Sequence, residues 1–393
     1  MTYATQIYDD VWAELPHLLS KNPKNIGAIS KVALVGVSEK NEFANNLIQN
    51  LEVMELPYEI FNLPSATGRS DAAELQVKKI GGKSVLRTGE LLERKSEFSH
   101  VVSCPRGNIH RRWVKLILQS HKIEFYEIES FLIKCAIPQE DERHKSWRTA
   151  IKNSIGEYLN LKNILYDEYS KVTLGNVLAF HLTGDLSYIR RVYRPYQTLY
   201  FDTDIPINFN SRDIVFVDCG ASIGESLFGF LDLSNQNYKK IILLEPDLLN
   251  IRLLKRSIYN LRKCGADVSK IQILQKGVAE KAGFAAFNHV GGHGGTFNIG
   301  DCKDEPVELI SIDSLGLSGE IIIKADVEGF EERLIQGAKE TIVKSKPKIL
   351  ISAYHKPSHI LDICGYLLSL NKEYRVALRH HTHLRWDTCL YFF

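Results

Sequence analysis

The chain has 393 residues, more than the roughly 250–300 at which single hydrophobic cores stop growing, so two domains are expected. Hydrophobic residues make up 44% and charged residues 24% of the chain, a balance that excludes a largely disordered or fibrous protein. A net charge of +2 provides no field that would steer the chain onto nucleic acid. The chain lacks a signal-like start and any apolar run of about 18 residues, which predicts a cytoplasmic protein without membrane insertion. Its seven cysteines are scattered, which predicts reduced thiols.

The first part of the chain alternates short apolar runs with segments of helical spacing. The strands are expected over 31–37, 100–104 and 123–128, and the helices over 41–51 and 109–121. This alternation predicts a small Rossmann-like α/β domain over residues 1–137. Only Gly36 stands where a nucleotide-binding turn would be rich in glycine, so this domain is not expected to bind a cofactor.

A polar and charged stretch over residues 138–152 predicts a linker or the start of an exposed helix. The apolar spacing over 154–186 is helical. We therefore expect an approach segment over 138–205, followed by a second domain over 206–393.

The second domain repeats the alternation of strands and helices more regularly. Its strands are expected over 214–219, 240–245, 271–275, 307–312, 320–326, 348–354, 374–380 and 388–392, and its helices over 223–233, 248–263, 331–344 and 358–370. Continuous apolar strands between helices indicate a doubly wound, mainly parallel sheet, and the final pair indicates an antiparallel ending. A seven-stranded sheet with that ending is typical of methyltransferases, whereas dehydrogenases have a six-stranded one.

The first motif with chemical meaning is DCGASIGE, which runs from Asp218 to Glu225 after an apolar strand. Gly220 and Gly224 would let a ligand approach the backbone, because glycine has no Cβ. An acid at Asp218 suits a cofactor with an ammonium group. The motif therefore favours S-adenosylmethionine over NAD, and a purely structural turn remains the other interpretation.

Glu245 ends the next strand, about 20 residues beyond the glycine turn, and Pro246 follows it. An acid at that place can accept hydrogen bonds from ribose hydroxyls, a feature that fits NAD and S-adenosylmethionine equally. Asp247 is expected to cap the following helix.

A third group of acids follows the strand over 320–326. Asp326 and Glu328 are two positions apart and therefore start on one side of the chain. Both are expected to face the crevice where doubly wound sheets bind ligands. Glu331 is read mainly as an acid at a helix N-terminus, where the helix dipole favours it.

Two histidines stand near the ends of later strands. His355 follows the strand over 348–354 and can exchange a proton near neutral pH. His380 lies at the connection of the last two strands, where a solvated hairpin is the alternative. Either Asp326 or His355 is expected to act as general base, with the other orienting it.

Taken together, the blocks VDCGASIGES, LLEPD, SIDSL, IKADVEGFEERLIQGA, SAYHKP, LRHH and DTCLY, in this order, resemble the FkbM-type methyltransferases. A weaker likeness extends back through Asp167 and Tyr200. The resemblance implies a class I, Rossmann-like methyltransferase domain and S-adenosylmethionine-dependent O-methylation of a sugar, polysaccharide or natural-product hydroxyl. The expected cofactor-binding residues are Asp218, Gly220, Ala221, Gly224, Glu225, Glu245, Pro246 and Val278. The expected catalytic residues are Asp326, His355, Glu328 and His380.

Three alternatives stay open at this point. Asp326, Glu328 and His355 could hold Mg²⁺ or Mn²⁺, which would lower the pKa of the acceptor hydroxyl. An NAD-dependent dehydrogenase or epimerase shares the glycine turn and the strand-end acid. A protein that binds a sugar or nucleotide without catalysis would share the fold, although the acids in the crevice argue against it. The N-terminal domain is expected to contribute to acceptor choice or to assembly into a homo-oligomer.

Overall fold

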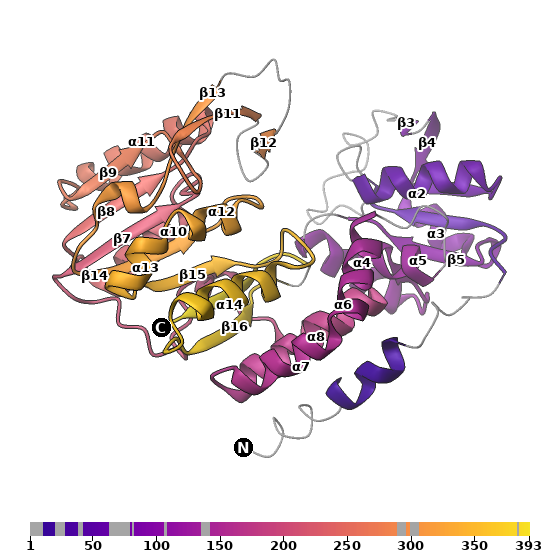
Figure 1. Cartoon of the computed structure of the whole chain (residues 1–393). Helices are drawn as coiled ribbons and strands as arrows, with labels where there is room; N and C mark the ends of the chain where they lie inside the picture. Colours follow the sequence, from indigo (N-terminus) through magenta and orange to yellow (C-terminus); the bar gives the residue numbers. More distant parts are fainter. Residues whose placement is uncertain are drawn as a thin grey trace. The chain divides into compact units, whose positions relative to one another are not determined.

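The computed structural model describes residues 11–19, 28–37, 42–62, 79–80, 82–105, 108–134, 142–288, 296–298, 306–382 and 385–393. The chain divides into two compact units (Figure 1). The N-terminal unit comprises Met1–Asn153 and Gly175–Arg191, and the C-terminal unit comprises Ser154–Leu174 and Val192–Phe393. This division differs from the predicted boundaries, since part of the predicted approach segment is assigned to each unit. The glycine-rich segment over 290–295 lies outside the described residues.

The N-terminal unit is an α/β unit, as its alternating pattern predicts. Its strands are β1 (Val32–Val35), β2 (Tyr58–Phe61), β3 (Lys79–Ile80), β4 (Lys83–Leu86), β5 (His100–Ser103) and β6 (Tyr126–Glu127), and its helices are α2 (Glu42–Val53), α3 (Thr88–Glu93), α4 (Asn108–Ser120), α5 (Ile128–Lys134) and α6 (Glu142–Asn153). The sheet order is β3-β4-β2-β1-β5-β6, and only β3 pairs antiparallel within the described sheet.

Two sequence predictions need correction in this unit. The predicted strand over 123–128 is reduced to β6, because Ile128, Phe131 and Leu132 are buried on one face of helix α5. The segment over 138–152, expected to be a linker or the start of an exposed helix, contains the helix α6 from residue 142 onward. The helix is not fully exposed, since its Trp147 is buried against the ring of His181. Tertiary packing thus decides the structure of both segments.

The segment over 154–186, predicted to be helical, forms two helices and the start of a third. They are α7 (Ile155–Ile164), α8 (Glu168–Thr183) and α9 (Leu186–Val192). The first two are separated at Leu165, which pairs with Val376 in an isolated bridge. The carboxylate of Asp167 then accepts a hydrogen bond from the backbone N–H of Ser170 at the start of α8.

The C-terminal unit contains a seven-stranded, mainly parallel sheet, as predicted. Its strands are β7 (Ile214–Cys219), β8 (Lys240–Leu244), β9 (Ile271–Leu274), β14 (Glu320–Ala325), β15 (Lys348–Ser352), β16 (Val376–His380) and β17 (Thr388–Phe392). The order is β16-β17-β15-β14-β7-β8-β9, with β17 antiparallel to both of its neighbours. The order reverses direction between β7 and β14, which makes this point the topological switch of the sheet.

A second sheet of four short strands accompanies the main one. Its strands are β10 (Gly277–Val278), β11 (Gly283–Asn288), β12 (Thr296–Asn298) and β13 (Pro306–Ile310), in the order β10-β13-β11-β12. The predicted strand over 307–312 is therefore β13 of this small sheet and adds nothing to the main one.

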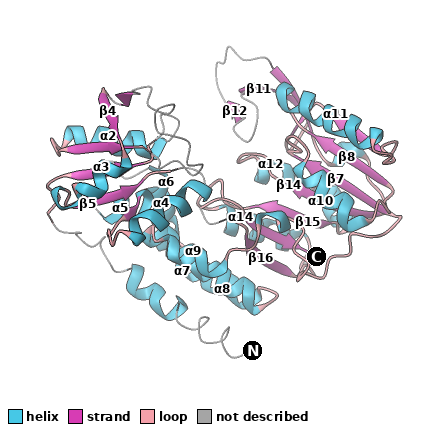
Figure 2. Cartoon of the chain, turned by 180° about the vertical axis from the view of Figure 1, so that it is seen from behind, coloured by secondary structure: helices cyan, strands magenta, loops and turns pink. Residues whose placement is uncertain are grey.

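Helices cover the main sheet (Figure 2). They are α10 (Glu225–Ser234), α11 (Leu248–Lys263), α12 (Glu331–Gln336), α13 (Lys339–Ser345) and α14 (His359–Leu370). The predicted single helix over 331–344 is broken at Gly337, where an added Cβ would lie 2.1 Å from the carbonyl oxygen of Ala279. The break follows from this close backbone approach.

The core beside α10 and α11 is rich in aromatic rings. Phe216 of β7 stacks on Phe230 of α10 with 4.3 Å between ring centroids, and Leu254 of α11 belongs to the same buried cluster. Successive residues of a strand point to opposite faces of the sheet, so residues two positions apart lie on the same face. Asp218, at the end of β7, therefore lies on the same face as Phe216. The core thus fixes the strand ends that carry the motifs.

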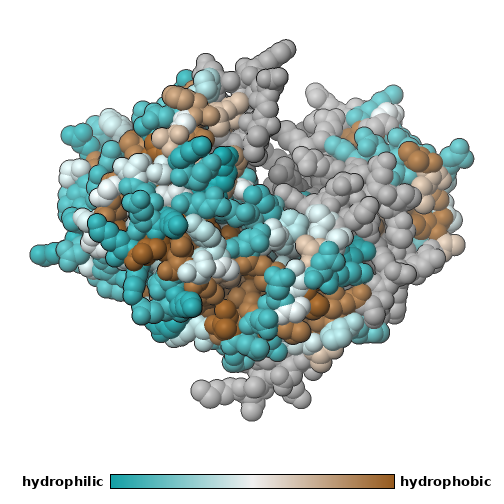
Figure 3. Space-filling model, viewed as in Figure 1, coloured by the Kyte–Doolittle hydropathy of each residue, from teal (hydrophilic) through white to brown (hydrophobic). Residues whose placement is uncertain are grey.

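In the described part of the C-terminal unit, the large apolar side chains that remain exposed are Leu159, Ile164, Tyr166, Tyr196, Phe228, Leu249, Leu253, Tyr259, Phe284 and Val343. On the face of this unit seen in Figure 3, hydrophilic and hydrophobic residues are intermixed. No helix in the described part of the chain combines the length and the apolar character needed to cross a bilayer.

Candidate functional site

The turn between β7 and α10 lies directly against the end of β14. Gly220 has φ +79°, and a Cβ added there would lie 1.8 Å from the carbonyl oxygen of Asp326. The backbone N–H of Asp326 donates a 3.0 Å hydrogen bond to the carbonyl of Cys219. Only glycine allows this approach, so the turn of the first motif and the acid of the third motif are brought into contact.

Asp218 is fully buried behind this turn. Its carboxylate lies 3.0 Å from the ammonium group of Lys324, which also donates a 2.7 Å hydrogen bond to the carbonyl of Gly220. The hydroxyl of Ser226 donates a hydrogen bond to the other oxygen of the Asp218 carboxylate. Burial by itself would lower the pKa of Lys324, but Asp218 and Asp326 outweigh it and raise that pKa. Asp218 therefore stabilises the turn from behind, and its predicted direct contact with a cofactor stays a prediction.

Glu245 follows β8 and is 5% exposed. Its two carboxylate oxygens accept hydrogen bonds from the backbone N–H groups of Ser222, at 2.8 Å, and Asp247, at 2.9 Å. Burial raises the pKa of Glu245 despite these donors. Asp247 caps α11 as predicted, since its side chain accepts from the N–H of Leu249 at 2.7 Å.

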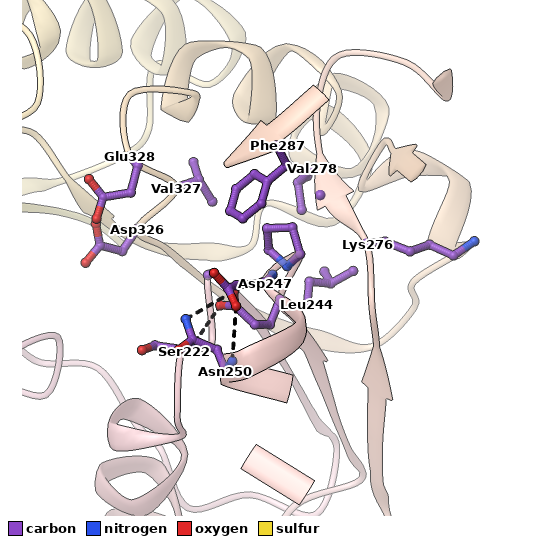
Figure 4. Close-up of a pocket in the computed structure, with 14 residues that line it drawn as sticks. Ser222, Leu244, Asp247, Asn250, Lys276, Val278, Phe287, Asp326, Val327 and Glu328 are labelled. Atoms are coloured by element: carbon purple, nitrogen blue, oxygen red, sulfur yellow. Dashed lines mark hydrogen bonds between the residues drawn. The ribbon is translucent and has the colours of Figure 1, made fainter. Parts of the chain in front are cut away.

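A pocket opens between these elements and encloses about 580 Å³, part of it continuous with solvent. It is lined by Gly220, Ser222, Leu244, Glu245, Pro246, Asp247, Asn250, Lys276, Gly277, Val278, Phe287, Asp326, Val327 and Glu328. In Figure 4 the apolar side chains of Phe287, Val278 and Val327 lie across from Ser222 and Asn250. The pocket thus has an apolar wall, a polar wall and, at Asp326 and Glu328, an acidic end.

Asp326 is held at the acidic end by two tyrosines. The hydroxyl of Tyr200 donates a 2.7 Å hydrogen bond to Oδ2, and the hydroxyl of Tyr354 lies 3.4 Å from Oδ1. Tyr200 is buried, and its pKa lies well above the usual value because of burial and the nearby Asp326 charge. It therefore remains a hydrogen-bond donor to Asp326.

Glu328 adopts a left-handed backbone conformation with φ +50°, which costs a residue with a Cβ about 1–2 kcal/mol. Gly329 follows with φ +96°. Two successive positive φ angles turn the chain from β14 into α12 within a few residues. The turn directs Glu328 toward the pocket, which it lines together with Asp326.

His355 stands behind these acids, between β15 and α14. Its Nε2 lies 3.3 Å from Glu328 and 3.6 Å from Asp326, and its Nδ1 lies 2.9 Å from Glu331. Burial alone would lower the pKa of His355, but the three carboxylates outweigh burial and raise that pKa well above its usual value. His355 is thus brought to the acidic end as predicted, although it does not line the pocket.

The predicted site residues separate into two groups. Six line the pocket: Gly220, Glu245, Pro246, Val278, Asp326 and Glu328. Ala221, Gly224 and Glu225 instead shape the turn and the start of α10: Ala221 donates its N–H to the carbonyl of Leu244, and Gly224, with φ +103°, precedes the first helical residue.

His380, predicted to be catalytic, does not line the pocket, and its catalytic role stays a prediction. His380 ends β16, and β17 and β15 separate that strand from β14. The ring is fully buried, and its Nδ1 lies 2.8 Å from the hydroxyl of Thr388. Its place in the sheet makes it a residue of the core, away from the pocket.

Several residues in or beside the pocket were not predicted. Phe287, which lines the pocket, comes from β11, a strand that the sequence pattern does not reveal. Tyr200, which contacts Asp326 without lining the pocket, comes from the irregular segment before β7. Asn250 could have been found, because it stands on the first turn of the helix that Asp247 caps and its side chain reaches Glu245 at 3.4 Å. For Tyr200 no local signal exists, since its partner is distant in the sequence.

The described geometry agrees with comparisons to known proteins. Residues 218–376 match the model of the methyltransferase FkbM domain. The crystal structure of methyltransferase FkbM from Methylobacillus flagellatus KT is 26% identical, covers 99% of this chain and 100% of that one, and has a TM-score of 0.79. Comparison with curated proteins finds no match.

More distant solved structures overlap with about half of the chain. They include an rRNA methylase from Streptococcus thermophilus, at 11% identity over 51% of this chain and 95% of that one, with a TM-score of 0.31. Fibrillarin from Aeropyrum pernix, solved with S-adenosyl-L-methionine, is 12% identical over 48% of this chain and 70% of that one, with a TM-score of 0.29.

The sheet order, with its antiparallel β17, defines the C-terminal unit as a class I, Rossmann-like methyltransferase fold. Within that class, the unit carries a methyltransferase domain of the FkbM family over residues 218–376.

Proposed function

We propose that the C-terminal unit binds S-adenosylmethionine in the described pocket and methylates a hydroxyl group of a sugar, polysaccharide or natural product. One observation carries the proposal. The pocket runs from Glu245, at the end of β8, past the Gly220 turn to Asp326, at the end of β14. Ligands of doubly wound sheets bind at the carboxyl ends of the strands beside the switch point, here between β7 and β14.

The lining of the pocket fits this cofactor part by part. Phe287 and Val278 provide the apolar wall that an adenine ring requires, and the Glu245 carboxylate can accept hydrogen bonds from ribose hydroxyls. The acidic end at Asp326 and Glu328 suits a cationic group. When bound, S-adenosylmethionine supplies a methyl group activated by a positively charged sulfur.

In the proposed reaction, Asp326 is the general base and His355 orients it. The acceptor oxygen forms a bond to the methyl carbon while the bond from that carbon to sulfur breaks, and the hydroxyl proton passes to Asp326. Asp326 takes this role because it lines the pocket. His355 lies behind Asp326, with its Nε2 3.6 Å from Oδ1 of that carboxylate. The hydrogen bond from Tyr200 fixes the carboxylate in place.

The alternatives from the sequence have separate tests. Mg²⁺ or Mn²⁺ held by Asp326, Glu328 and His355 stays a prediction, and it requires that EDTA abolish turnover and that either ion restore it. An NAD-dependent enzyme requires that NAD bind in place of S-adenosylmethionine. A binding protein without catalysis requires that the cofactor bind and that no acceptor gain a methyl group.

Calorimetric titration of the full chain with S-adenosylmethionine, S-adenosylhomocysteine and NAD tests the proposal. The first two are expected to bind and NAD is not. Glu245→Gln should weaken binding by about tenfold because it removes a charge-assisted hydrogen bond to the ribose. Glu340→Gln, a change of an exposed acid on α13, is the matched control and should bind as the unmodified chain does. Absence of binding by the unmodified chain would refute the assignment.

The acceptor is sought with S-adenosylmethionine labelled in its methyl group. Candidate sugars, polysaccharides and natural products are incubated with the full chain and examined for the mass gain of one methyl group. A labelled methyl group on an oxygen of the acceptor supports O-methylation, whereas a label on nitrogen or carbon contradicts that part of the proposal.

A further inference from the structure

Two histidines and a glutamate converge below the acidic end of the pocket. Glu331 is the first residue of α12, and His359 is the first residue of α14. His355 stands four residues before His359, and α12 and α14 pack against each other. One ligand atom of each residue lies within 4.8 Å of the others. The side chains of Glu331 and His359 are fully buried, and that of His355 is 8% exposed.

The three side chains lie close together but do not form well-oriented hydrogen bonds with one another. His355 Nδ1 lies 2.9 Å from Oε1 of Glu331, and His359 Nδ1 lies 3.6 Å from Oε2. Both ring nitrogens of each histidine and Oε2 of Glu331 lack a hydrogen bond of acceptable geometry. Ligand atoms of a tetrahedral zinc ion, with bonds of about 2.0–2.1 Å, are about 3.3 Å apart. The contacts of the two rings with Glu331, each to a different carboxylate oxygen, are near this value, and the three ligand atoms lie within 4.8 Å of one another.

The outer nitrogens of both histidines also face carboxylates. His355 Nε2 lies 3.3 Å from Glu328, and His359 Nε2 lies 3.3 Å from Glu332. A histidine that binds a metal through one nitrogen almost always donates its other N–H to a carboxylate, a carbonyl or water. Both rings are placed for this pattern, with Nδ1 toward Glu331 and Nε2 within 3.3 Å of an outer carboxylate, although neither Nε2 forms a hydrogen bond of acceptable geometry.

Negative charge gathers around the two rings. Four carboxylates surround the two imidazoles: those of Asp326, Glu328, Glu331 and Glu332. Lys356 pairs with Glu332 at 3.4 Å and lies outside the buried centre. A buried carboxylate is costly unless it is paired or coordinates a metal, and a divalent ion would supply two positive charges at the point where these groups meet.

We propose that Glu331, His355 and His359 bind a divalent transition metal ion, for which Zn²⁺ is the best match to a site of two histidines and one glutamate. The site differs from the sequence-predicted set in two of its three ligands. The carboxylate of Asp326 receives hydrogen bonds from tyrosines, and Asp326 is an outer group here. The ion would join α12 to α14 and fix His355, whose Nε2–H then points to Glu328 and Asp326.

The test uses the full chain after removal of metal with a chelator. Calorimetry with Zn²⁺ in the presence of a competing chelator should show one high-affinity equivalent, and Co²⁺ should give the visible absorption of a cobalt ion with nitrogen ligands. Glu331→Gln and His359→Gln should each weaken Zn²⁺ binding by about 100-fold or more, and Glu332→Gln by about tenfold. The exposed residues His121 and Glu340 provide the controls His121→Gln and Glu340→Gln, which should bind Zn²⁺ normally.

The outcomes separate this site from the proposed function. Titration of the same samples with S-adenosylmethionine reports on the pocket independently of the metal. If the unmodified chain takes up no Zn²⁺ above the level of Glu331→Gln and His359→Gln, the site is refuted even when the cofactor binds. Circular dichroism shows whether the variants fold. If neither variant folds, the Zn²⁺ stoichiometry and the Co²⁺ spectrum of the unmodified chain decide whether the metal site exists.

Discussion

The hydroxyl of Tyr200 donates a 2.7 Å hydrogen bond to Asp326, although 126 positions of sequence separate the two residues. The same hydroxyl lies 2.7 Å from the hydroxyl of Ser352, at the end of β15. Tyr200 has φ +66°, an uncommon backbone conformation for a residue with a Cβ. The segment before β7 therefore reaches over the strand ends and fixes the proposed base.

Tyr200→Phe should lower kcat by about tenfold, because a hydrogen bond to a charged group contributes roughly 1.5–3 kcal/mol. The affinity for S-adenosylmethionine should stay within a few-fold, since Tyr200 does not line the pocket. Steady-state kinetics on the acceptor found by the screen measures both effects. Tyr259→Phe, a change of an exposed tyrosine on α11, is the control. An unchanged kcat in Tyr200→Phe would show that this hydrogen bond does not position a catalytic group.

Asp326→Asn keeps the shape of the side chain and removes its capacity to take a proton. Turnover should fall by roughly 10²–10⁴, the usual contribution of a positioned general base. Cofactor affinity should remain within a few-fold in calorimetry, because the adenine and ribose parts of the proposed site lie at the other end of the pocket. Near-normal turnover by Asp326→Asn would exclude this residue as the base.

The buried ion pair of Asp218 and Lys324 should be important for folding. Asp218→Asn leaves the ammonium group of Lys324, which is 3% exposed, without its charged partner, and should lower the free energy of unfolding by about 3–5 kcal/mol. Adding Lys324→Met should restore part of the loss. Urea unfolding measures both changes.

The exposed pair of Lys346 and Glu373 serves as the control for this comparison. Lys346→Ala should change the free energy of unfolding by less than about 1 kcal/mol, because water and salt screen such pairs. Equal effects of Asp218→Asn and Lys346→Ala would contradict a special role of the buried pair.

Gly220 and Gly265 form a matched pair, because both have positive φ, +79° and +88°, but only Gly220 has a neighbour in the way of a Cβ. Gly265→Ala should cost about 1–2 kcal/mol from the backbone conformation alone. Gly220→Ala must also displace the carbonyl of Asp326, and should abolish cofactor binding in addition to lowering stability. Thermal unfolding and calorimetry with S-adenosylmethionine measure the two effects. Similar behaviour of both variants would mean that the contact at Gly220 can relax.

Asp167 forms an ion pair with the buried guanidinium of Arg379 at 2.6 Å. Burial would raise the pKa of Asp167, but Arg379 and Ser170 outweigh it and hold that pKa below the usual value. A carboxyl group with a lowered pKa in the folded state stabilises the fold above its unfolded pKa, of about 3.9, and this stability is lost as the pH falls through the folded pKa.

The free energy of unfolding should therefore decline below about pH 4 in the unmodified chain, and Asp167→Asn should reduce this part of the pH dependence. At neutral pH, Asp167→Asn should be less stable by about 3 kcal/mol, because the buried guanidinium of Arg379 loses its 2.6 Å ion pair and keeps Asp202, at 3.3 Å, as its charged partner among the described residues. Urea unfolding over a series of pH values measures the difference. An identical pH dependence in both proteins would show that another group causes the acid sensitivity.

The sequence by itself determined the main sheet of the C-terminal unit and the strand ends that carry the pocket. Buried parallel strands must be continuous apolar runs, and the turn beside a ligand must contain glycine, so both leave a local signal in the sequence. Gly220, Glu245 and Asp326 could be predicted for this reason, since each stands next to such a run. The capping role of Asp247 follows from equally local rules.

Only the tertiary structure decided which side chains meet. Tyr200 and Phe287 belong to the site through contacts with distant segments, and no local spacing encodes those contacts. Asp218, predicted to contact the cofactor, pairs with Lys324. His380, predicted to be catalytic, is buried on β16, which β17 and β15 separate from β14 because sheet order does not follow chain order. Glu331 shows the same limit. Its place in the sequence indicated only an acid at the start of a helix, whereas the packing of α12 against α14 brings two imidazoles to its buried carboxylate.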